Sequence, residues 1–367
     1  MNRLKKMHKI SWAEPCIGKE EHNAIQKVMN SNWLTQGPIT EKLEKKLSQF
    51  IGSKYAVVTN NGTSSLICSL LAHGIGSNDE VIVPSFTFVA TVNAILSVGA
   101  KPVLVDCNPK TFNTDIDFVK KKITKKTKAI MPVDVSGMPV DVDSFRELAK
   151  EKNLILIQDS AEGIGAKYKQ KKIGSFGHST IFSFHIAKVV TGVEGGCIVT
   201  NDNEIAQKAR LIRSHGDAGQ YVHKIFGLNF RISDLHSAII LEQLKKIDRF
   251  LQHRAKLAKK YKDELHQFEF QEIPDFVSRH PYMLFGLLTP KKYRNSLNKY
   301  LQKNRIDTRI CWLPVHKQPY HGKIFDIKLK NSEDVFSKIL NLPMGNGLTE
   351  KNCQIVIDTI KKWKPSL

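Results

Sequence analysis

The chain has 367 residues, of which 41% are hydrophobic and 25% are charged, a composition typical of a globular protein large enough for two domains. No apolar run is long enough to span a bilayer, and the basic start at residues 1–7 is not followed by the apolar core of a signal peptide, so we expect a cytoplasmic protein without a membrane partner. The formal net charge of +21 favours an anionic ligand; because the lysines are spread along helix faces without an aromatic-interleaved patch, we expect no nucleic-acid partner.

The cysteines, histidines and glycines exclude several common types of site. The six cysteines form no CxxC pair, and the histidines form no HExxH motif, so we expect reduced thiols and no metal. The glycine pairs at 74/76, 163/165 and 345/347 each lack the third glycine of GxGxxG, which argues against a dinucleotide enzyme.

The first predicted strand, residues 55–59, leads into a polar turn with the sequence Asn-Asn-Gly-Thr-Ser-Ser at residues 60–65. Glycine lets the backbone approach a ligand closely, and the free amides at a helix start bind an anion, helped by the hydroxyls of Thr63 and Ser64. The turn is a candidate phosphate site, although a helix start rich in serine and threonine is more often an ordinary cap. Shortly after the second strand, Phe88 is an aromatic residue that can stack on a flat cofactor ring, although phenylalanine there is usually core.

Strand-like runs alternate with helical stretches through the first two thirds of the chain. This alternation predicts a mainly parallel sheet with helices on both faces. The further runs are residues 80–84, 101–106, 128–133, 154–159, 180–184 and 196–200.

Asp159 ends the continuous apolar run 154–159, which predicts a buried parallel strand whose carboxyl end opens on a ligand crevice. An aspartate in this position is often only a cap for the next turn. It also suits the pyridine nitrogen of pyridoxal phosphate (PLP), whose protonated state a carboxylate preserves.

Lys188 follows the apolar run 180–184 and precedes a glycine cluster, so it lies on a strand-to-loop connection of the kind that carries active sites in α/β proteins. A lysine amine forms a Schiff base with an aldehyde cofactor when a site lowers its proton affinity. The alternative is a solvated surface charge, as most lysines of this chain are expected to be. A Schiff-base lysine and a pyridine-binding aspartate at the ends of two strands of one sheet support each other.

The last third of the chain predicts a second domain. Residues 203–214 and 233–265 are expected to be helices, and the second leads out of the large domain. From residue 268 onward, short strands and helices are punctuated by prolines. We therefore expect an N-terminal segment at 1–30 that packs with the small domain, a large cofactor-binding domain at 31–245 and a small C-terminal domain at 246–367.

The motifs in this order resemble the sugar-nucleotide aminotransferases of the DegT/DnrJ/EryC1/StrS family, nearly from end to end. The resemblance implies the aspartate aminotransferase fold, fold type I of the PLP enzymes, with a mainly parallel seven-stranded sheet between helices and a smaller α+β C-terminal domain. It is carried by residues 32–38, 61–64, 84–88, 158–162, 183–188, 227–231 and 314–316.

The resemblance also implies roles for individual residues. Lys188 and Asp159 are the catalytic residues, as the Schiff-base lysine and the partner of the pyridine nitrogen. The remaining cofactor contacts are Gly62, Thr63, Ser64 and Ser183 at the phosphate, Phe88 on the ring, Glu162 near the phenolic oxygen, and Asn229 reaching the phosphate from the neighbouring subunit. Asn229 thus implies a homodimer with composite active sites. The implied substrate contacts are Thr35, His185, Arg231 and His316.

The activity implied is transfer of an amino group from L-glutamate, which leaves as 2-oxoglutarate, to a nucleotide-linked keto sugar for surface polysaccharide synthesis. Segments 158–162 and 221–231 are similar to members that make perosamine on GDP. As the nucleotide of a 4-keto-6-deoxy sugar substrate, we expect GDP and UDP about equally, and TDP less. Two alternatives remain: a PLP-dependent sugar dehydratase, against which Lys188 stands because dehydrating relatives have histidine there, and a non-catalytic PLP-binding regulatory protein.

Overall fold

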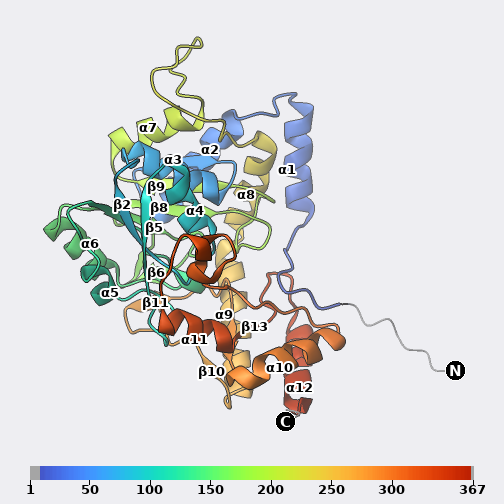
Figure 1. Ribbon diagram of the computed structural model, residues 1–367. Coiled ribbons are helices and arrows are strands. Elements are labelled where there is room, and N and C mark those ends of the chain that lie inside the picture. Colours follow the sequence, from blue (N-terminus) through green and yellow to red (C-terminus); the bar gives the residue numbers. More distant parts are fainter. Residues whose placement is uncertain (1–8, 365–367) are drawn as a thin grey trace.

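The computed structural model describes residues 9–364, with a large mixed sheet in one half of the molecule and a small sheet in the other (Figure 1). The basic residues 1–7 and the first part of the predicted segment 1–30 lie outside the described residues. Within the described residues, the large sheet has seven strands in the order β1-β9-β8-β5-β4-β2-β3. Their bounds are β1 Tyr55–Thr59, β2 Glu80–Pro84, β3 Lys101–Val105, β4 Thr127–Ile130, β5 Ile155–Asp159, β8 Ser179–Ser183 and β9 Gly196–Thr200.

The predicted mainly parallel sheet is confirmed. Strands β8, β5, β4, β2 and β3 run parallel to one another, and β9 is antiparallel to both β8 and β1. In β5 and β8, Gln158 pairs with Thr180 and Asp159 with Ile181, so the carboxyl ends of these two strands meet at one edge.

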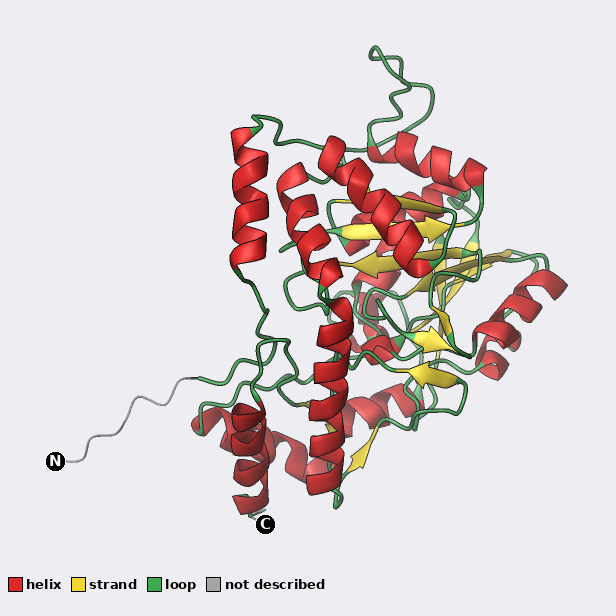
Figure 2. Ribbon diagram, turned by 180° about the vertical axis from the view of Figure 1, so that it is seen from behind, coloured by secondary structure: helices red, strands yellow, loops and turns green. Residues whose placement is uncertain are grey.

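Successive side chains of the strands alternate between two hydrophobic cores, because side chains in a strand point to opposite faces. Val58 packs in one core and Val57 in the other. One core is completed by α2 (Pro38–Ile51), α6 (Val142–Glu151) and α8 (Asp234–Lys245), and the other by α3 (Gly62–Ala72), α4 (Ala90–Ser97) and α7 (Asn203–Arg213). Figure 2 shows the strands as an inner layer with helices on either side.

The single helix predicted over residues 233–265 is two helices, α8 and α9 (Ile247–Glu264), which are separated at Lys246. The break carries no glycine or proline signal. Lys246 caps α8 with its backbone N–H, and its ammonium lies 2.7 Å from the buried Glu21 carboxylate, so a tertiary ion pair occupies the break. Helix α9 then runs from the large sheet to the small one (Figure 1).

The small sheet has the antiparallel order β10-β12-β13 and packs with α9 and two C-terminal helices around residues such as Leu257, Leu297 and Val356. The remaining bounds are α5 Ile116–Lys120, β6 Lys167–Tyr168, β7 Lys171–Lys172, β10 Glu269–Phe270, β11 Val277–Arg279, β12 Gly286–Leu288, α10 Lys291–Lys303, α11 Lys330–Lys338, β13 Ile339–Asn341 and α12 Glu350–Lys362.

The N-terminal segment contacts both halves of the molecule. Ile10 forms a parallel bridge with Ile306 and belongs to the core of the small half. Helix α1 (Lys19–Asn30) instead packs along α8, where Gln243 Nε2 donates to Glu21 Oε1 at 2.7 Å. The segment therefore joins the two halves, and the predicted domain limits at 30/31 and 245/246 stay predictions.

Between α7 and α8, residues 214–233 form a loop that extends away from the body of the molecule (Figure 1). Several of its apolar side chains are exposed, with Tyr221 at 89% and Phe226 at 69% of full exposure.

Within the part of the chain that the structure describes, none of the helices is both long and apolar enough to cross a bilayer, and no cluster of histidine, cysteine and acidic residues could hold a metal ion. The six cysteines are all unpaired.

Candidate active site

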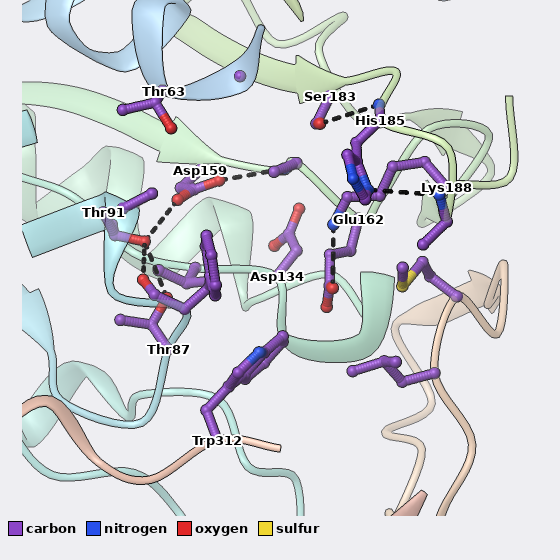
Figure 3. Close-up of a pocket in the computed structure, with 18 of the residues that line it drawn as sticks. Thr63, Thr87, Thr91, Asp134, Asp159, Glu162, Ser183, His185, Lys188 and Trp312 are labelled. Atoms are coloured by element: carbon purple, nitrogen blue, oxygen red, sulfur yellow. Dashed lines mark hydrogen bonds and ion pairs between the residues drawn. The ribbon is translucent and has the colours of Figure 1, made fainter. Parts of the chain in front are cut away.

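A cavity of about 300 Å³ opens at the carboxyl ends of the parallel strands, beside the first turn of α3 (Figure 3). Most of its walls come from strand exits of the large sheet, and the facing wall comes from the N-terminal segment and the C-terminal half of the chain. The residues that line it include Trp12, Gly62, Thr63, Phe88, Thr91, Asp134, Asp159, Glu162, Ser183, His185, Lys188, Met283, Leu284, Cys311 and Trp312.

Lys188 enters the cavity from a tight turn that follows β8. Its backbone N–H donates to the carbonyl of His185 at 2.9 Å, and Phe184 bonds Gly195 across the base of the loop at 2.8 Å. The Lys188 ammonium lies 3.2 Å from Glu162 Oε1, and the two side chains are 16% and 8% exposed. Burial raises the pKa of Glu162 above its ordinary value, and the Lys188 charge opposes that rise. The amine is thus presented in a mostly dry site with one carboxylate partner.

Asp159 ends β5 and is buried in the cavity wall. Thr91 Oγ1 donates to its Oδ2 at 2.8 Å, and the backbone N–H of Ala161 donates to its Oδ1 at 3.1 Å. Burial raises the pKa of this carboxyl, and the bond from Thr91 opposes the rise. The carboxyl is therefore oriented by neutral donors, and among the described residues no ion pair occupies it.

The first turn of α3 has the form of an anion site. The side chain of Asn61 caps the helix by accepting from the Ser64 N–H at 2.8 Å. Among the described residues, no acceptor meets the N–H of Gly62 or of Thr63, and Thr63 lines the cavity. A Cβ at Gly62 would lie 3.0 Å from Ser183 Cβ, so glycine keeps the turn close to β8. Orphan amides at a helix N-terminus bind phosphate.

The structure brings most of the predicted cofactor contacts together. Gly62, Thr63, Phe88, Glu162 and Ser183 line the cavity with Lys188 and Asp159, and Phe88 is 56% exposed. Ser64 is buried next to them without lining the cavity. These residues supply an amine for an aldehyde, a carboxylate for a ring nitrogen and a helix start for a phosphate, so the cavity fits PLP. Their roles remain predictions that the geometry supports.

Among the other predicted contacts, only His185 lies at the cavity. Of the predicted substrate residues, His185 lines the cavity, whereas Thr35 and Arg231 do not. Asn229 is exposed, and the carbonyl of the adjacent Phe230 accepts from Asn60 N at 2.9 Å, so this strand runs beside the phosphate turn.

His316 is not brought to the cavity. Its ring is fully buried, with Nδ1 2.7 Å from Ser85 Oγ and Nε2 3.1 Å from Glu333 Oε1. Because both ring nitrogens have partners within the protein, this geometry gives no support to a substrate contact by His316.

Sequence reasoning missed Thr91, Asp134, Trp12 and Trp312. Asp134 follows the predicted strand 128–133, so the strand-exit argument used for Asp159 could have found it. The two tryptophans reach the cavity through tertiary packing from opposite ends of the chain, and no local pattern indicates this.

Asp134 is a second buried carboxyl beside Asp159. Gln158 Nε2 lies 2.9 Å from each of its oxygens, and the Val140 N–H donates to Oδ1 at 3.0 Å. The Gln158 Oε1 atom in turn lies 2.9 Å from Nε2 of the half-buried His178. Burial raises the pKa of Asp134 to about 7, and the charge of Asp159 adds to the rise. No cation contacts Asp134 among the described residues.

Comparison with known proteins identifies relatives along almost the whole chain. The model of the DegT/DnrJ/EryC1/StrS aminotransferase family matches residues 15–361. GDP-perosamine synthase from Caulobacter vibrioides is 37% identical over 95% of this chain and 96% of that protein. PseC, an aminotransferase of pseudoaminic acid biosynthesis from Helicobacter pylori, is 31% identical with a TM-score of 0.91 over 97% of this chain and 99% of that one. A Streptococcus pneumoniae structure in its PLP form has a TM-score of 0.92 at 25% identity, over 96% of this chain and 98% of that one.

We predict that Asp134→Asn changes how stability depends on pH. The native carboxyl titrates near 7 and the unfolded one near its ordinary value of 3.8, so the native state binds more protons between these values and stability is lost as pH rises through them. Asparagine has no proton to lose. The free energy of unfolding of the variant, relative to the parent, should therefore rise by about 2 kcal/mol from pH 5 to pH 8.

Urea unfolding at the two pH values measures this difference, with Asp117→Asn on the exposed surface as the control. An equal parent-to-variant difference at both pH values would contradict the raised pKa of Asp134.

Proposed function

Because the chain belongs to the DegT/DnrJ/EryC1/StrS aminotransferase family, we propose that it transfers an amino group from L-glutamate to a nucleotide-linked keto sugar, with PLP as its cofactor. The observation that carries the proposal is the meeting of Lys188, Asp159 and the first turn of α3 in one cavity. These groups match the aldehyde, the ring nitrogen and the phosphate of PLP. They lie far apart in the sequence, and the fold brings them together in this cavity.

PLP supplies an aldehyde that holds amines covalently and a ring that accepts electrons. Lys188 is the amine that anchors the aldehyde and, once displaced by a substrate, moves a proton at its Nζ to and from the reacting carbon. Asp159, oriented by Thr91, holds the proton on the ring nitrogen. Glu162 Oε1 forms an ion pair with the Lys188 ammonium at 3.2 Å and helps to hold the lysine side chain in this dry site.

The amino acceptor we propose is a 4-keto-6-deoxy sugar on GDP or UDP, and the product is an amino sugar for surface polysaccharide synthesis. A GDP-linked sugar is the first substrate to test, because the Caulobacter relative is named GDP-perosamine synthase. Glutamate is the proposed donor and 2-oxoglutarate its product. His185 in the cavity wall and the outlying Thr35 and Arg231 are the proposed substrate contacts.

We further propose a homodimer in which Asn229 reaches the phosphate of the partner's cofactor. Asn229 lies on the extended loop between α7 and α8, whose apolar side chains Tyr221 and Phe226 are exposed in the single chain. An exposed apolar loop of this kind is typical of a protein interface. A twofold axis then gives each site one such loop from the other subunit.

The first test concerns Lys188. Incubation with PLP, borohydride reduction and peptide mass analysis should place the cofactor on the peptide that contains Lys188, and Lys188→Ala should abolish both this adduct and amino transfer. Lys172→Ala is the matched control, because Lys172 is also half-buried but lies outside the cavity. An adduct on another lysine, or normal turnover by Lys188→Ala, would exclude the proposed role.

The second test concerns Asp159. Asp159→Asn should retain the covalent adduct but slow the half-reaction with glutamate by on the order of 100-fold or more, since a neutral amide no longer holds the ring proton. Stopped-flow absorbance of the loaded protein measures this rate. If Asp159→Asn reacts as fast as the parent, the pairing with the ring nitrogen is wrong.

The third test asks whether the sites are shared. Lys188→Ala and Asn229→Phe proteins should each be inactive, and refolding them together should restore about half of the parental activity per heterodimer. One of the two sites then has its own Lys188 and an intact Asn229 from the partner. Refolded Lys188→Ala alone is the control. A verified heterodimer without activity, or a monomer by sedimentation, would refute the composite site.

A further inference from the structure

The cavity has two chemically different sides. The large sheet and the helices that follow its strands supply the polar side, with Asp159 from β5, Thr91 from α4 and Thr63 from α3. The facing wall is mainly apolar and is formed by Trp12, Met283, Leu284, Cys311 and Trp312. Figure 3 shows the Trp312 indole across the cavity from Thr91 and Asp159. The proposed cofactor contacts use only the polar side, so the tryptophan wall has no role in the function proposed so far.

Trp12 is held in place by backbone hydrogen bonds between its own segment and residues 344–347. Its carbonyl accepts from Met344 N at 3.0 Å, and the Glu14 carbonyl accepts from Gly347 N at 2.9 Å. At Gly345, a Cβ would lie 2.4 Å from Glu14 N, so only glycine lets the two segments approach this closely. A large aromatic side chain on so fixed a backbone is a preformed surface, and little entropy is lost when a ligand stacks on it.

Arg309 packs on Trp12. Its guanidinium carbon lies 5.5 Å from the centre of the indole ring, within the range of a cation–π contact. Trp12 lines the cavity and Arg309 does not, so Arg309 contacts the cavity wall through this ring. Arg309 Nη1 also bonds Asp307 and the Thr308 carbonyl, which holds the guanidinium on the ring.

Both indoles keep their polar group free. Among residues 9–364, no acceptor lies within hydrogen-bond distance of Nε1 of Trp12 or of Trp312, whereas Trp33 Nε1 donates to the Gln36 carbonyl at 3.3 Å. Neither N–H belongs to the buried polar atoms that lack a partner, so both are accessible to solvent and can be reached by a bound ligand. Two unpaired donors on one cavity wall, each attached to a broad apolar face, suit a ligand with flat or apolar faces and polar edges.

We propose that Trp12 and Trp312 are stacking surfaces that recognise the nucleotide sugar, with the nucleobase on Trp12 and the sugar ring on Trp312, and that Arg309 is a positioning residue for the Trp12 ring. The proposal rests on the proposed function, because it takes its ligand from there. The sugar must reach Lys188, and Trp312 lines the same cavity as this amine. Trp12 comes from a different segment and provides a second flat surface for the other end of the ligand.

The test is equilibrium binding to the PLP-loaded full-length protein, followed by calorimetry and by tryptophan fluorescence. The probes are GDP, UDP and dTDP, together with GDP-mannose and UDP-N-acetylglucosamine, which add a sugar without a reactive ketone. The parent should bind at least one nucleoside diphosphate with quenching. Trp12→Ala should weaken that binding by roughly 5- to 100-fold, the range for the loss of one base–aromatic stack.

Trp12→Leu keeps apolar bulk without an aromatic face and should lose as much affinity as Trp12→Ala, so a packing defect in the alanine variant does not decide the result. Trp312→Ala should bind the nucleoside diphosphate like the parent but lose the additional affinity that the sugar supplies. Arg309→Gln should weaken nucleotide binding, and Arg309→Lys, which restores a cation over the ring, should recover part of it.

Arg146→Gln is the matched control and should leave binding unchanged. Arg146 also stacks on an aromatic ring, at 5.9 Å from the centre of Phe176, and also pairs with an aspartate, and its side chain is 48% exposed against 47% for Arg309. It lies outside the cavity.

The two proposals fail in different ways. A parent that binds none of the probes would overturn the nucleotide-linked substrate and the stacking surface with it. If the parent binds a probe and both Trp12→Leu and Trp12→Ala bind it equally tightly, the stacking surface alone would be overturned.

Discussion

The parallel pairing of β5 with β8 determines where chemistry can occur in this protein. Their register places Asp159 opposite Ile181, so the aspartate and the turn that carries Lys188 leave the sheet at the same edge. Parallel strands are buried on both faces, and polar side chains at their carboxyl ends therefore gather in a crevice with little water. The first turn of α3 joins them because β1 pairs with β9, and β9 pairs with β8.

This crevice holds more carboxyl groups than cations, and this imbalance limits which cofactors can bind there. Asp134, Asp159 and Glu162 are all buried there, and Lys188 is the one ammonium that contacts them among the described residues. Burial raises the pKa of all three carboxyls, because water no longer stabilises their charged forms. A cationic ring nitrogen beside Asp159 would relieve this imbalance. The arrangement thus favours a cofactor that brings a positive charge to Asp159, with its own phosphate held apart at α3.

The sequence predicts those parts of the fold and site that depend on local pattern. The strand runs of the large sheet are continuous and apolar, and Lys188, Asp159 and the Thr63 turn each follow such a run, so the rule that strand exits form sites was enough to find them. Features that depend on tertiary contacts could not be found in this way. The helix break at Lys246 is occupied by an ion pair with Glu21, which lies more than 200 residues away. The resemblance implies a substrate contact for His316, but its ring is enclosed by Ser85 and Glu333.

The difference between features set by local pattern and features set by tertiary contacts explains why the chemistry of such a chain is easier to recognise than its substrate. The groups that fit the cofactor are fixed by the large sheet alone. The facing wall is assembled from the N-terminal segment and the C-terminal half of the chain, because Ile10 forms a bridge with Ile306 and Trp12 then meets Arg309 and Met344. The side chains of that wall lie outside the strands of the large sheet and their exits, and they pack against the core beside the sheet. Substrate preference can therefore vary while the amine, the carboxylate and the phosphate turn keep their positions, and the tryptophan wall is the part of this cavity most open to such variation.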